Sequence, residues 1–581
     1  MSFLKKIESL SKRIGRFLTI KKVSYIALIL NATTIILSIP YLLLKNYSIL
    51  WDILGVILIT TLFWNFLLIF QSGKRVDKSK PAGKRLNWAC YFYLLFALIS
   101  MIFIMLGNLL ISVRYTMNLL SVYSVIYFFY FGLFVYGIII ALIDIKLIDR
   151  KELWTSPEIN KKSRDNNANV HKSLLKRILL ILSYLIFLLS LYYGLCIALG
   201  LYIDILVIPT ILAGQFGIFF SVMFMANTLI LLKLRGSRKR PERYYAIAFI
   251  GVISSTLLLV PLLSTPIANV IAESNFTEAF GSDWKEEIPS DMEEKYFLRT
   301  PFTTPQYFLG VEPEECEIEK DVKFYEDDEL TLYFDAYMPK DDPKDLPGEG
   351  SMLIRLHGGG WSMLDKGTTN MLQMNKYFAA QGYIVFDVQY AQYDLGIPIP
   401  NTPDYLLGDY TLDEIVATLG YFTKYITNHS AEYDVNLDSV FISGGSAGGH
   451  LTCALALGIA SGDYKDMFGT NLTIKGLIPF YPANGMAKWF GIEHEDKDLL
   501  NPERLVDKQS PPCLIYQGTH DLLSSWFHIA ESIKNSYEDA DNEECAIIWI
   551  PMGGHASDIY FNSYYNLMFL YYMERFIYLY H

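Results

Sequence analysis

Ser446 lies in a setting where a serine side chain could act as a nucleophile. The sequence GGSAGGH, which contains it, follows an apolar run typical of a strand and precedes one typical of a helix. Gly444 and Gly448 complete a G-x-S-x-G pattern, and their lack of side chains permits a sharp strand-to-helix turn that exposes the hydroxyl. A serine hydroxyl attacks a carbonyl carbon efficiently only when a base accepts its proton, and that base needs a carboxylate to orient it.

An aspartate and a histidine later in the chain could supply this carboxylate and this base. Asp521 follows the apolar run PCLIYQ, and His555 follows the apolar run CAIIWIP. Both come directly after predicted strands, so we expect them to converge on Ser446 at one edge of a sheet. Asp558 is the alternative acid. Three other histidines are interpreted as surface or core residues: His450, His520 and His528.

The elements that must position these residues alternate between short apolar runs and helical patterns. A hairpin is predicted at 322–338, where two alternating runs flank an acidic turn. Further strands are predicted at 352–356, 383–390, 439–443, 475–481, 512–517 and 545–551. Two of the intervening segments, 411–426 and 447–460, are apolar at helical spacing. This alternation predicts a mostly parallel sheet with helices on both faces.

Two glycine-rich motifs and the late Asp and His reveal a family resemblance. With HGGGW after a strand and GGSAGGHLT at the serine, the region from about 320 to 581 resembles the α/β-hydrolase superfamily, in particular its hormone-sensitive-lipase-like and acetyl-esterase group. The resemblance implies that the backbone N–H groups of Gly358, Gly359 and Ala447 bind the oxyanion. It also implies a serine-esterase reaction that requires no metal ion and no organic cofactor.

Two positions near these motifs have separate interpretations. His357 of HGGGW is interpreted as structural, because the base role belongs to His555. Related enzymes often have a Tyr-Arg pair after the next strand, whereas this chain has Tyr390 followed by Ala391. The substrate pocket is therefore expected to differ from theirs in detail.

The first 268 residues have the composition of a membrane domain. Seven apolar stretches each have roughly the ~20 residues that a bilayer-spanning helix needs. They lie at 23–44, 49–70, 88–112, 119–143, 178–200, 207–232 and 245–268, and the break within GLYIDILVIP is the least distinct. We therefore predict an all-α transmembrane domain at 1–268, a linker and entry segment at 269–319, and an α/β-hydrolase domain at 320–581.

The distribution of basic residues predicts the orientation in the membrane. Of the 30 Lys and Arg residues in 1–268, 28 lie in four alternate loops, and only Lys45 and Arg114 lie in the others. Because cytoplasmic loops are enriched in Lys and Arg, the N-terminus is expected in the cytoplasm. A seventh crossing then leaves the hydrolase domain outside, in a multi-pass protein of the cell membrane whose first span is an uncleaved signal anchor.

Polar residues inside the predicted spans have two possible roles. We interpret them as hydrogen-bonding between helices, with a polar substrate path as the alternative. The amides concerned are Asn31, Asn65, Asn108, Gln215 and Asn227.

These patterns together predict a membrane-anchored serine carboxylic-ester hydrolase that acts outside the cytoplasm. The substrate class is a small-molecule, glycan or lipid ester. The alternative is an acyltransferase that uses the same side chains to move an acyl group to a glycan or lipid alcohol. Nucleic acid is not expected as a partner, because residues 269–581 hold 50 of the 60 Asp and Glu residues and only 19 of the 49 Lys and Arg residues.

Overall fold

The N-terminal part of the protein is a bundle of long helices. The computed structural model describes residues 19–44, 49–75, 79–114, 118–148, 174–200, 213–235, 241–521, 523 and 526–581. Within these ranges seven helical segments are long and apolar enough to cross a membrane, as predicted. The least distinct break, in GLYIDILVIP, lies outside the described residues apart from Gly200. The helices are α2 (Ile20–Leu43), α3 (Ile49–Arg75), α4 (Pro81–Val113), α5 (Leu119–Ile148), α7 (Leu174–Leu199), α9 (Gly217–Arg235) and α10 (Pro241–Leu258) continued by α11 (Val260–Phe280).

Polar side chains join several of these helices in the interior of the bundle. Asn31 of α2 donates a hydrogen bond to the side-chain oxygen of Asn65 in α3 (2.7 Å), and Asn65 donates in turn to the hydroxyl of Tyr93 in α4 (2.9 Å). Gly137 of α5 makes room for this cluster, since a Cβ there would lie 2.4 Å from the Asn31 side-chain oxygen. Such bonds hold membrane helices together because lipid offers the amides no other partner.

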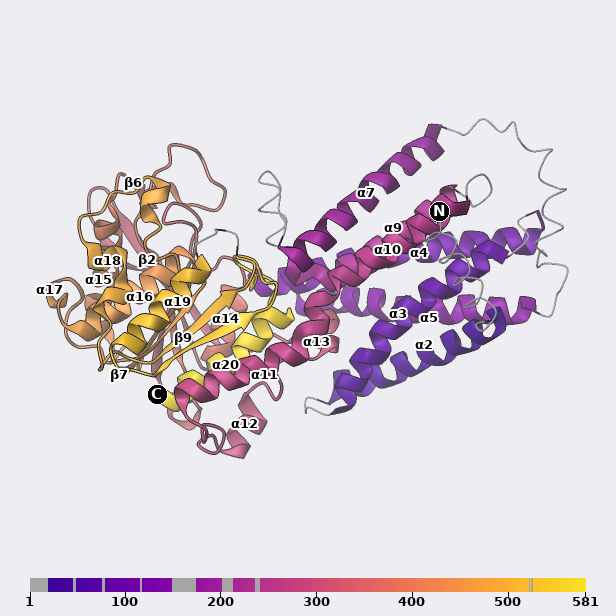
Figure 1. Cartoon of the computed structure of the whole chain (residues 1–581). Coiled ribbons are helices and arrows are strands. Elements are labelled where there is room, and N and C mark those ends of the chain that lie inside the picture. The colour runs from indigo at the N-terminus through magenta and orange to yellow at the C-terminus, as the bar shows by residue number, and fades with distance from the viewer. Residues whose placement is uncertain are drawn as a thin grey trace.

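The segment between the last predicted span and the sheet is largely helical. Helix α11 extends past residue 268 to Phe280 and packs on β10 and α20 of the next domain (Figure 1). Two short helices follow, α12 (Ser290–Tyr296) and α13 (Thr304–Leu309), and α13 packs against α3, α4 and α5. Residues 269–319 therefore contact both parts of the molecule.

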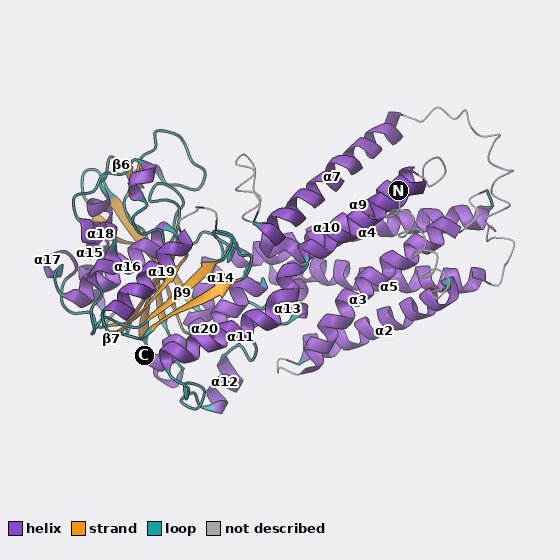
Figure 2. Ribbon diagram, in the orientation of Figure 1, coloured by secondary structure: helices purple, strands orange, loops and turns teal. Residues whose placement is uncertain are grey.

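The C-terminal part is built on an eight-stranded sheet in the order β1-β2-β4-β3-β7-β8-β9-β10. Figure 2 shows the strands of this part in orange, with helices packed around them. The hairpin β1–β2 is antiparallel, β2 pairs antiparallel with β4, and the remaining neighbours are parallel. This is the predicted mostly parallel sheet. The strands are β1 (Glu317–Glu326), β2 (Thr331–Met338), β3 (Ser351–Leu356), β4 (Ile384–Val388), β7 (Asn436–Gly445), β8 (Ile474–Phe480), β9 (Cys513–Gly518) and β10 (Cys545–Ile550).

Helices cover both faces of this sheet. Successive strand residues point to opposite faces, and each face presents apolar side chains to a core of its own. Leu353, Phe441 and Leu514 lie in one apolar core with α11, α14, α20 and the membrane helices. Ile354 and Ile442 lie in a second core with α15, α16 and α19. The helices are α14 (Met371–Ala379), α15 (Leu412–His429), α16 (Ala447–Ser461), α19 (Trp526–Asp539) and α20 (Tyr564–Tyr580), with short helices α17 (Lys465–Phe468) and α18 (Lys497–Leu500) and a small sheet of β5 (Gln392–Tyr393) and β6 (Leu407–Gly408).

Candidate active site

Ser446 occupies a strained turn between a strand and a helix. Strand β7 ends at Gly445, α16 begins at Ala447, and the backbone of Ser446 has φ 58° and ψ −118°. A non-glycine residue in this region costs on the order of 1–3 kcal/mol, so the surroundings must hold it there. One reason they can is that the turn packs tightly on the end of β3. A Cβ at Gly448 would lie 2.2 Å from the Leu356 carbonyl oxygen and 2.5 Å from that of His357.

The three side chains proposed from the sequence meet at the carboxyl edge of the sheet. Nε2 of His555 lies 2.9 Å from Oγ of Ser446, and Nδ1 of His555 lies 2.9 Å from Oδ2 of Asp521. With the ring proton on Nδ1, His555 donates to Asp521 and accepts from the Ser446 hydroxyl. Asp521 follows β9 and His555 follows β10, and only 4% and 8% of their surfaces are exposed. Water is therefore largely excluded from this chain of hydrogen bonds.

Asp521 and Asp558 have different partners. Asp521 also accepts weak hydrogen bonds from the Gln517 side chain (3.4 Å) and from the Leu523 backbone N–H (3.3 Å). Asp558 instead accepts from the hydroxyl of Tyr481 (2.7 Å), and burial raises the pKa of its carboxyl group. The Nδ1 hydrogen bond of His555 thus goes to the first-choice acid of the sequence and not to the alternative.

The other candidate histidines lie elsewhere. His450 is fully buried, where its Nε2 donates to the Leu499 carbonyl (2.8 Å) and its Nδ1 accepts from the Trp361 indole (3.3 Å). Burial lowers the pKa of His450 to about 4, so the ring is neutral at ordinary pH. The side chain of His528 is exposed beside Glu531. His520 packs against the end of α7, where a Cβ at Gly200 would lie 3.6 Å from its Nε2.

The HGGGW segment runs beside Ser446. A Cβ at Gly358 would lie 2.9 Å from the Gly445 carbonyl oxygen and 3.4 Å from Cβ of Ser446. Gly359 has φ 122°, and a Cβ there would lie 1.9 Å from the carbonyl oxygen of Met363, so neither position has room for a side chain. Ala447 is the first residue of α16, and its N–H is among the first-turn amides that lack an intrahelical carbonyl partner.

The side chain of His357 stabilises the HGGGW segment. Its ring stacks on that of Tyr390 with centroids 4.3 Å apart, and its Nδ1 donates to the Gly358 carbonyl oxygen (2.7 Å). The Tyr390 hydroxyl donates to the His357 carbonyl oxygen (2.7 Å). Burial lowers the pKa of His357 to about 4, which is consistent with a structural role for a neutral ring. Tyr390 therefore helps to hold the glycine segment in place through His357, even though alanine and not arginine follows it at position 391.

Tyr481 adjoins the site and was not identified from the sequence. Its ring meets that of His555 edge to face with centroids 4.6 Å apart, and a Cβ at Gly445 would lie 2.7 Å from its hydroxyl oxygen. Its backbone N–H donates to the Tyr516 carbonyl oxygen (2.7 Å). No motif marks Tyr481, and the only available signal was its position as the last residue of the predicted strand 475–481.

Comparison with known proteins gives one family match and one curated relative. The BD-FAE family model matches residues 421–526, which include Ser446 and Asp521. A Mycobacterium tuberculosis protein named "Probable carboxylic ester hydrolase LipM" is 26% identical over 240 residues, which cover 37% of this chain and 51% of that protein. The chain thus spans about half the length of this relative.

Several solved structures are also similar to part of the chain. Thermogutta terrifontis esterase 2 in its apo form is 19% identical with a TM-score of 0.35, covering 46% of this chain and 92% of that chain. Esterase B from Lactobacillus rhamnosis is 18% identical with a TM-score of 0.31, covering 43% and 80%.

The sheet and its helices agree with the family match. A mostly parallel sheet carries a serine at a strand-to-helix turn, and loops after two later strands carry an aspartate and a histidine in that chain order. The C-terminal domain therefore has the α/β-hydrolase fold, and its residues 421–526 are similar to the BD-FAE family.

Proposed function

We propose that this protein is a membrane-anchored serine carboxylic-ester hydrolase whose active site lies outside the cytoplasm. The observation that carries the proposal is the chain of hydrogen bonds from Asp521 through His555 to Ser446, with 2.9 Å at each step. The name of the M. tuberculosis relative, a carboxylic ester hydrolase, supports the same reaction class. The outside location rests on the distribution of Lys and Arg between alternate loops.

The geometry supports a two-step reaction. Ser446 Oγ attacks the ester carbonyl carbon while Nε2 of His555 takes its proton, and Asp521 stabilises the imidazolium that forms. The N–H groups of Gly358, Gly359 and Ala447 bind the developing oxyanion, and losing one such donor typically costs ~3 kcal/mol. His555 then protonates the leaving alcohol. In the second step His555 activates water, which releases the acid from Ser446.

A substitution of the proposed nucleophile tests this function. The full-length wild-type chain in detergent should hydrolyse p-nitrophenyl acetate or butyrate, and Ser446→Ala should abolish both this activity and covalent labelling by a fluorophosphonate. Ser461→Ala is the matched control, because Ser461 lies at the far end of the same helix. Ester hydrolysis retained by Ser446→Ala would remove Ser446 from its role.

Acyl transfer is the second candidate because the site adjoins the membrane helices. Gly200 at the end of α7 lies against His520, and a Cβ at Gly214, next to α9, would lie 3.4 Å from the Met552 carbonyl oxygen. An alcohol dissolved in the bilayer would therefore meet the loops that carry Asp521 and His555. Ester cleavage in detergent micelles with an added long-chain alcohol distinguishes the two. Transfer to the alcohol far above its mole fraction relative to water would identify a transferase.

A further inference from the structure

A side chain from the membrane domain reaches the loop that carries His555. Gln215 lies in the short 3-10 turn Gly214–Phe216 that directly precedes α9, at the start of the sixth candidate span. Its Nε2 donates to the Ala556 carbonyl oxygen (3.4 Å), and its Oε1 accepts from the backbone N–H of Tyr560 (2.6 Å). Ala556 directly follows His555. One side-chain amide of the membrane domain thus bonds at two points to the loop on the C-terminal side of the proposed base.

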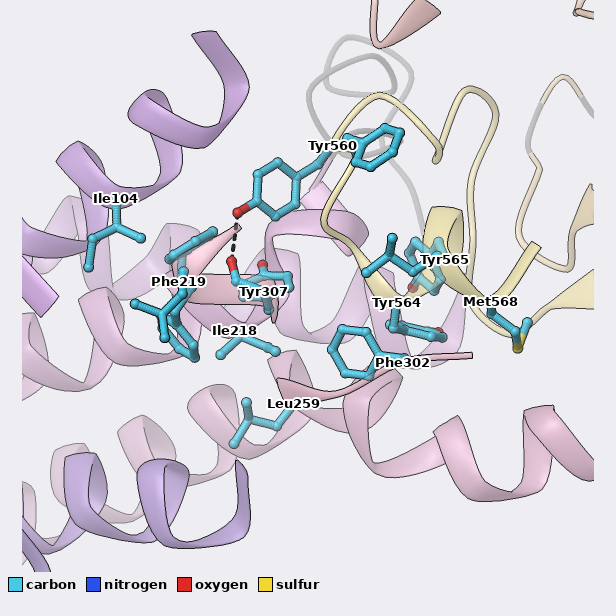
Figure 3. Close-up of a cluster of buried hydrophobic side chains, with 14 of the residues drawn as sticks. Ile104, Ile218, Phe219, Leu259, Phe302, Tyr307, Tyr560, Tyr564, Tyr565 and Met568 are labelled. Atoms are coloured by element: carbon cyan, nitrogen blue, oxygen red, sulfur yellow. Dashed lines mark hydrogen bonds between the residues drawn. The ribbon is translucent and has the colours of Figure 1, made fainter. Parts of the chain in front are cut away.

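Gln215 is itself held in place through its backbone by Tyr307, which is bonded in turn to Tyr560. Its backbone carbonyl accepts from the hydroxyl of Tyr307 (2.9 Å), and the hydroxyl of Tyr560 donates to the Tyr307 carbonyl (2.7 Å). Figure 3 shows the Tyr307 and Tyr560 side chains beside Phe219 of α9, with the bond between the two tyrosines drawn. The ring centroids of Phe219 and Tyr307 are 4.6 Å apart. Gln215 is 2% exposed, so water does not compete for its side-chain bonds.

The loop itself contains strained positions that need external support. Met552 and Ala556 have φ 59° and 54°, in the left-handed region that non-glycine residues rarely adopt. Such conformations persist where surrounding contacts over-determine them. Met552 packs on the apolar cluster of Ile197, Ala213 and Leu258 at the ends of the membrane helices. The strained part of the loop therefore contacts the membrane domain on both sides of His555.

The hydrolase domain holds the loop both before His555 and beyond Ala556. Before His555, the backbone N–H of His520 donates to the Gly553 carbonyl oxygen (2.9 Å), and the backbone N–H of Met552 donates to the Thr519 hydroxyl oxygen (2.8 Å). The Tyr516 hydroxyl hydrogen-bonds with Oγ of Ser557 (2.8 Å), and the Asn370 side chain donates to the Asp558 carbonyl oxygen (2.6 Å). In the part of the chain that the structure describes, the side-chain hydrogen bond to the Ala556 carbonyl oxygen comes from Gln215. The position of the His555 backbone is thus set jointly by the sheet and by a membrane helix.

We propose that Gln215 is a positioning residue for His555, so that the membrane domain completes the esterase site and does more than anchor it. This inference rests on the proposed function. Removal of the two Gln215 side-chain bonds frees the loop to relax, which displaces the imidazole from Ser446 and Asp521. Misplacement of a catalytic group by about 1 Å can lower the rate of a reaction roughly 100-fold.

The test compares apolar replacements of two amides in the same span, in the full-length chain in detergent. Gln215→Met keeps the side-chain volume and removes both bonds. Asn227→Leu is the matched control, because Asn227 donates to the Ser183 carbonyl (3.0 Å) within the membrane domain. Hydrolysis of p-nitrophenyl butyrate is normalised to sites titrated with a fluorophosphonate, so that loss of folded protein does not lower the measured kcat.

We expect Gln215→Met to lower kcat per titrated site by about 10- to 100-fold with KM changed less than about twofold, and to shift the acid limb of the pH profile. Asn227→Leu should match the wild type. A purely structural role would change the yield of titratable sites and leave kcat and the pH profile unchanged.

A second variant keeps part of the contact in case Gln215→Met does not fold. Gln215→Glu retains the acceptor for Tyr560 N–H and, when protonated, a donor to the Ala556 carbonyl. Its activity relative to wild type should therefore be higher at pH 6 than at pH 9. Equal kcat per titrated site and superimposable pH profiles for wild type and variants would overturn the proposal. Absence of hydrolysis and of labelling in the wild type would instead overturn the proposed function.

Discussion

At the scale of single residues, the site depends on which of two buried carboxylates orients His555. Asp521 is close to His555 in space, with Oδ2 2.9 Å from Nδ1, and Asp558 is close along the chain, three residues away. Asp521 accepts the Nδ1 hydrogen bond, whereas Asp558 is occupied by Tyr481, whose ring also packs on His555. An acceptor at Nδ1 holds the imidazole in the tautomer that leaves Nε2 free to take the serine proton.

Amide substitutions at the two carboxylates should separate their roles. Asp521→Asn should lower kcat by roughly 10³- to 10⁴-fold, because an amide stabilises the wrong tautomer of His555 and cannot stabilise the imidazolium. Asp558→Asn should stay within about tenfold of wild type, since the asparagine oxygen still accepts from Tyr481. Steady-state hydrolysis of p-nitrophenyl butyrate measures both. A larger loss in Asp558→Asn than in Asp521→Asn would transfer the orienting role to Asp558.

At the scale of elements, one buried histidine connects three segments around the serine. His450 lies on α16, directly behind Ser446, and contacts the Leu499 carbonyl of α18 and the Trp361 indole of the HGGGW segment. It therefore links the helix that starts at the serine turn to the segment that carries the proposed oxyanion donors. Because this ring is desolvated, its neutral form is favoured in the folded state.

This burial makes stability depend on pH in a defined direction. The pKa of His450 falls from 6.5 to about 4 on folding, so between these values the unfolded chain binds a proton that the folded chain does not. Above about pH 6.5 His450 is neutral in both states and does not lower stability. As the pH falls toward 4, it lowers the free energy of unfolding by about 3 kcal/mol in total. His450→Gln removes this titration, so its unfolding midpoint in detergent should fall less between pH 7.5 and 4.5 than that of wild type.

Exposed His528 provides the control for this measurement. Its side chain is 65% exposed, so His528→Gln should keep the pH dependence of the wild-type midpoint. All other buried acids and histidines are shared by the three proteins and cancel in the comparison. If the midpoint of His450→Gln dropped as steeply as that of wild type, the buried ring would not be a source of acid sensitivity.

At the scale of the whole molecule, the hydrolase domain and the membrane helices share a core. Asn275 of α11 donates a hydrogen bond to the Ile547 carbonyl oxygen of β10 (2.9 Å). Asn108 of α4 donates to the Phe308 carbonyl oxygen of α13 (3.0 Å). Tyr307 and Phe308 pack among the membrane helices. The sheet edge that carries the site faces the ends of α7 and α9 (Figure 1).

The proposed orientation predicts the behaviour of reporter fusions. Alkaline phosphatase, which folds only outside the reducing cytoplasm, should be active when fused after His581. The same reporter fused after Ser79, in the basic segment between α3 and α4, should be inactive. Enzyme activity in intact bacterial cells, normalised to the amount of fusion protein, measures both. Activity after Ser79 and none after His581 would reverse the topology.

The sequence alone determined much of this protein because the relevant signals are local. Seven apolar stretches and a strand-helix alternation follow from short-range hydropathy, and both appear in the structure. The G-x-S-x-G pattern and the residues that follow strands led to Ser446, Asp521 and His555, whose side chains do meet. Parallel strands end at one edge, so residues far apart in the chain become neighbours without any local signal of their pairing.

Only the tertiary structure decided which partners the ambiguous residues have. Asp558 is three residues from His555, yet Asp521 makes the bond, because the loop turns Asp558 toward Tyr481. Gln215 was expected to bond to another membrane helix, but its partners Ala556 and Tyr560 lie more than 340 residues away. A side-chain amide satisfies any well-placed donor or acceptor, so hydropathy predicts that it will be paired and only packing selects the partner.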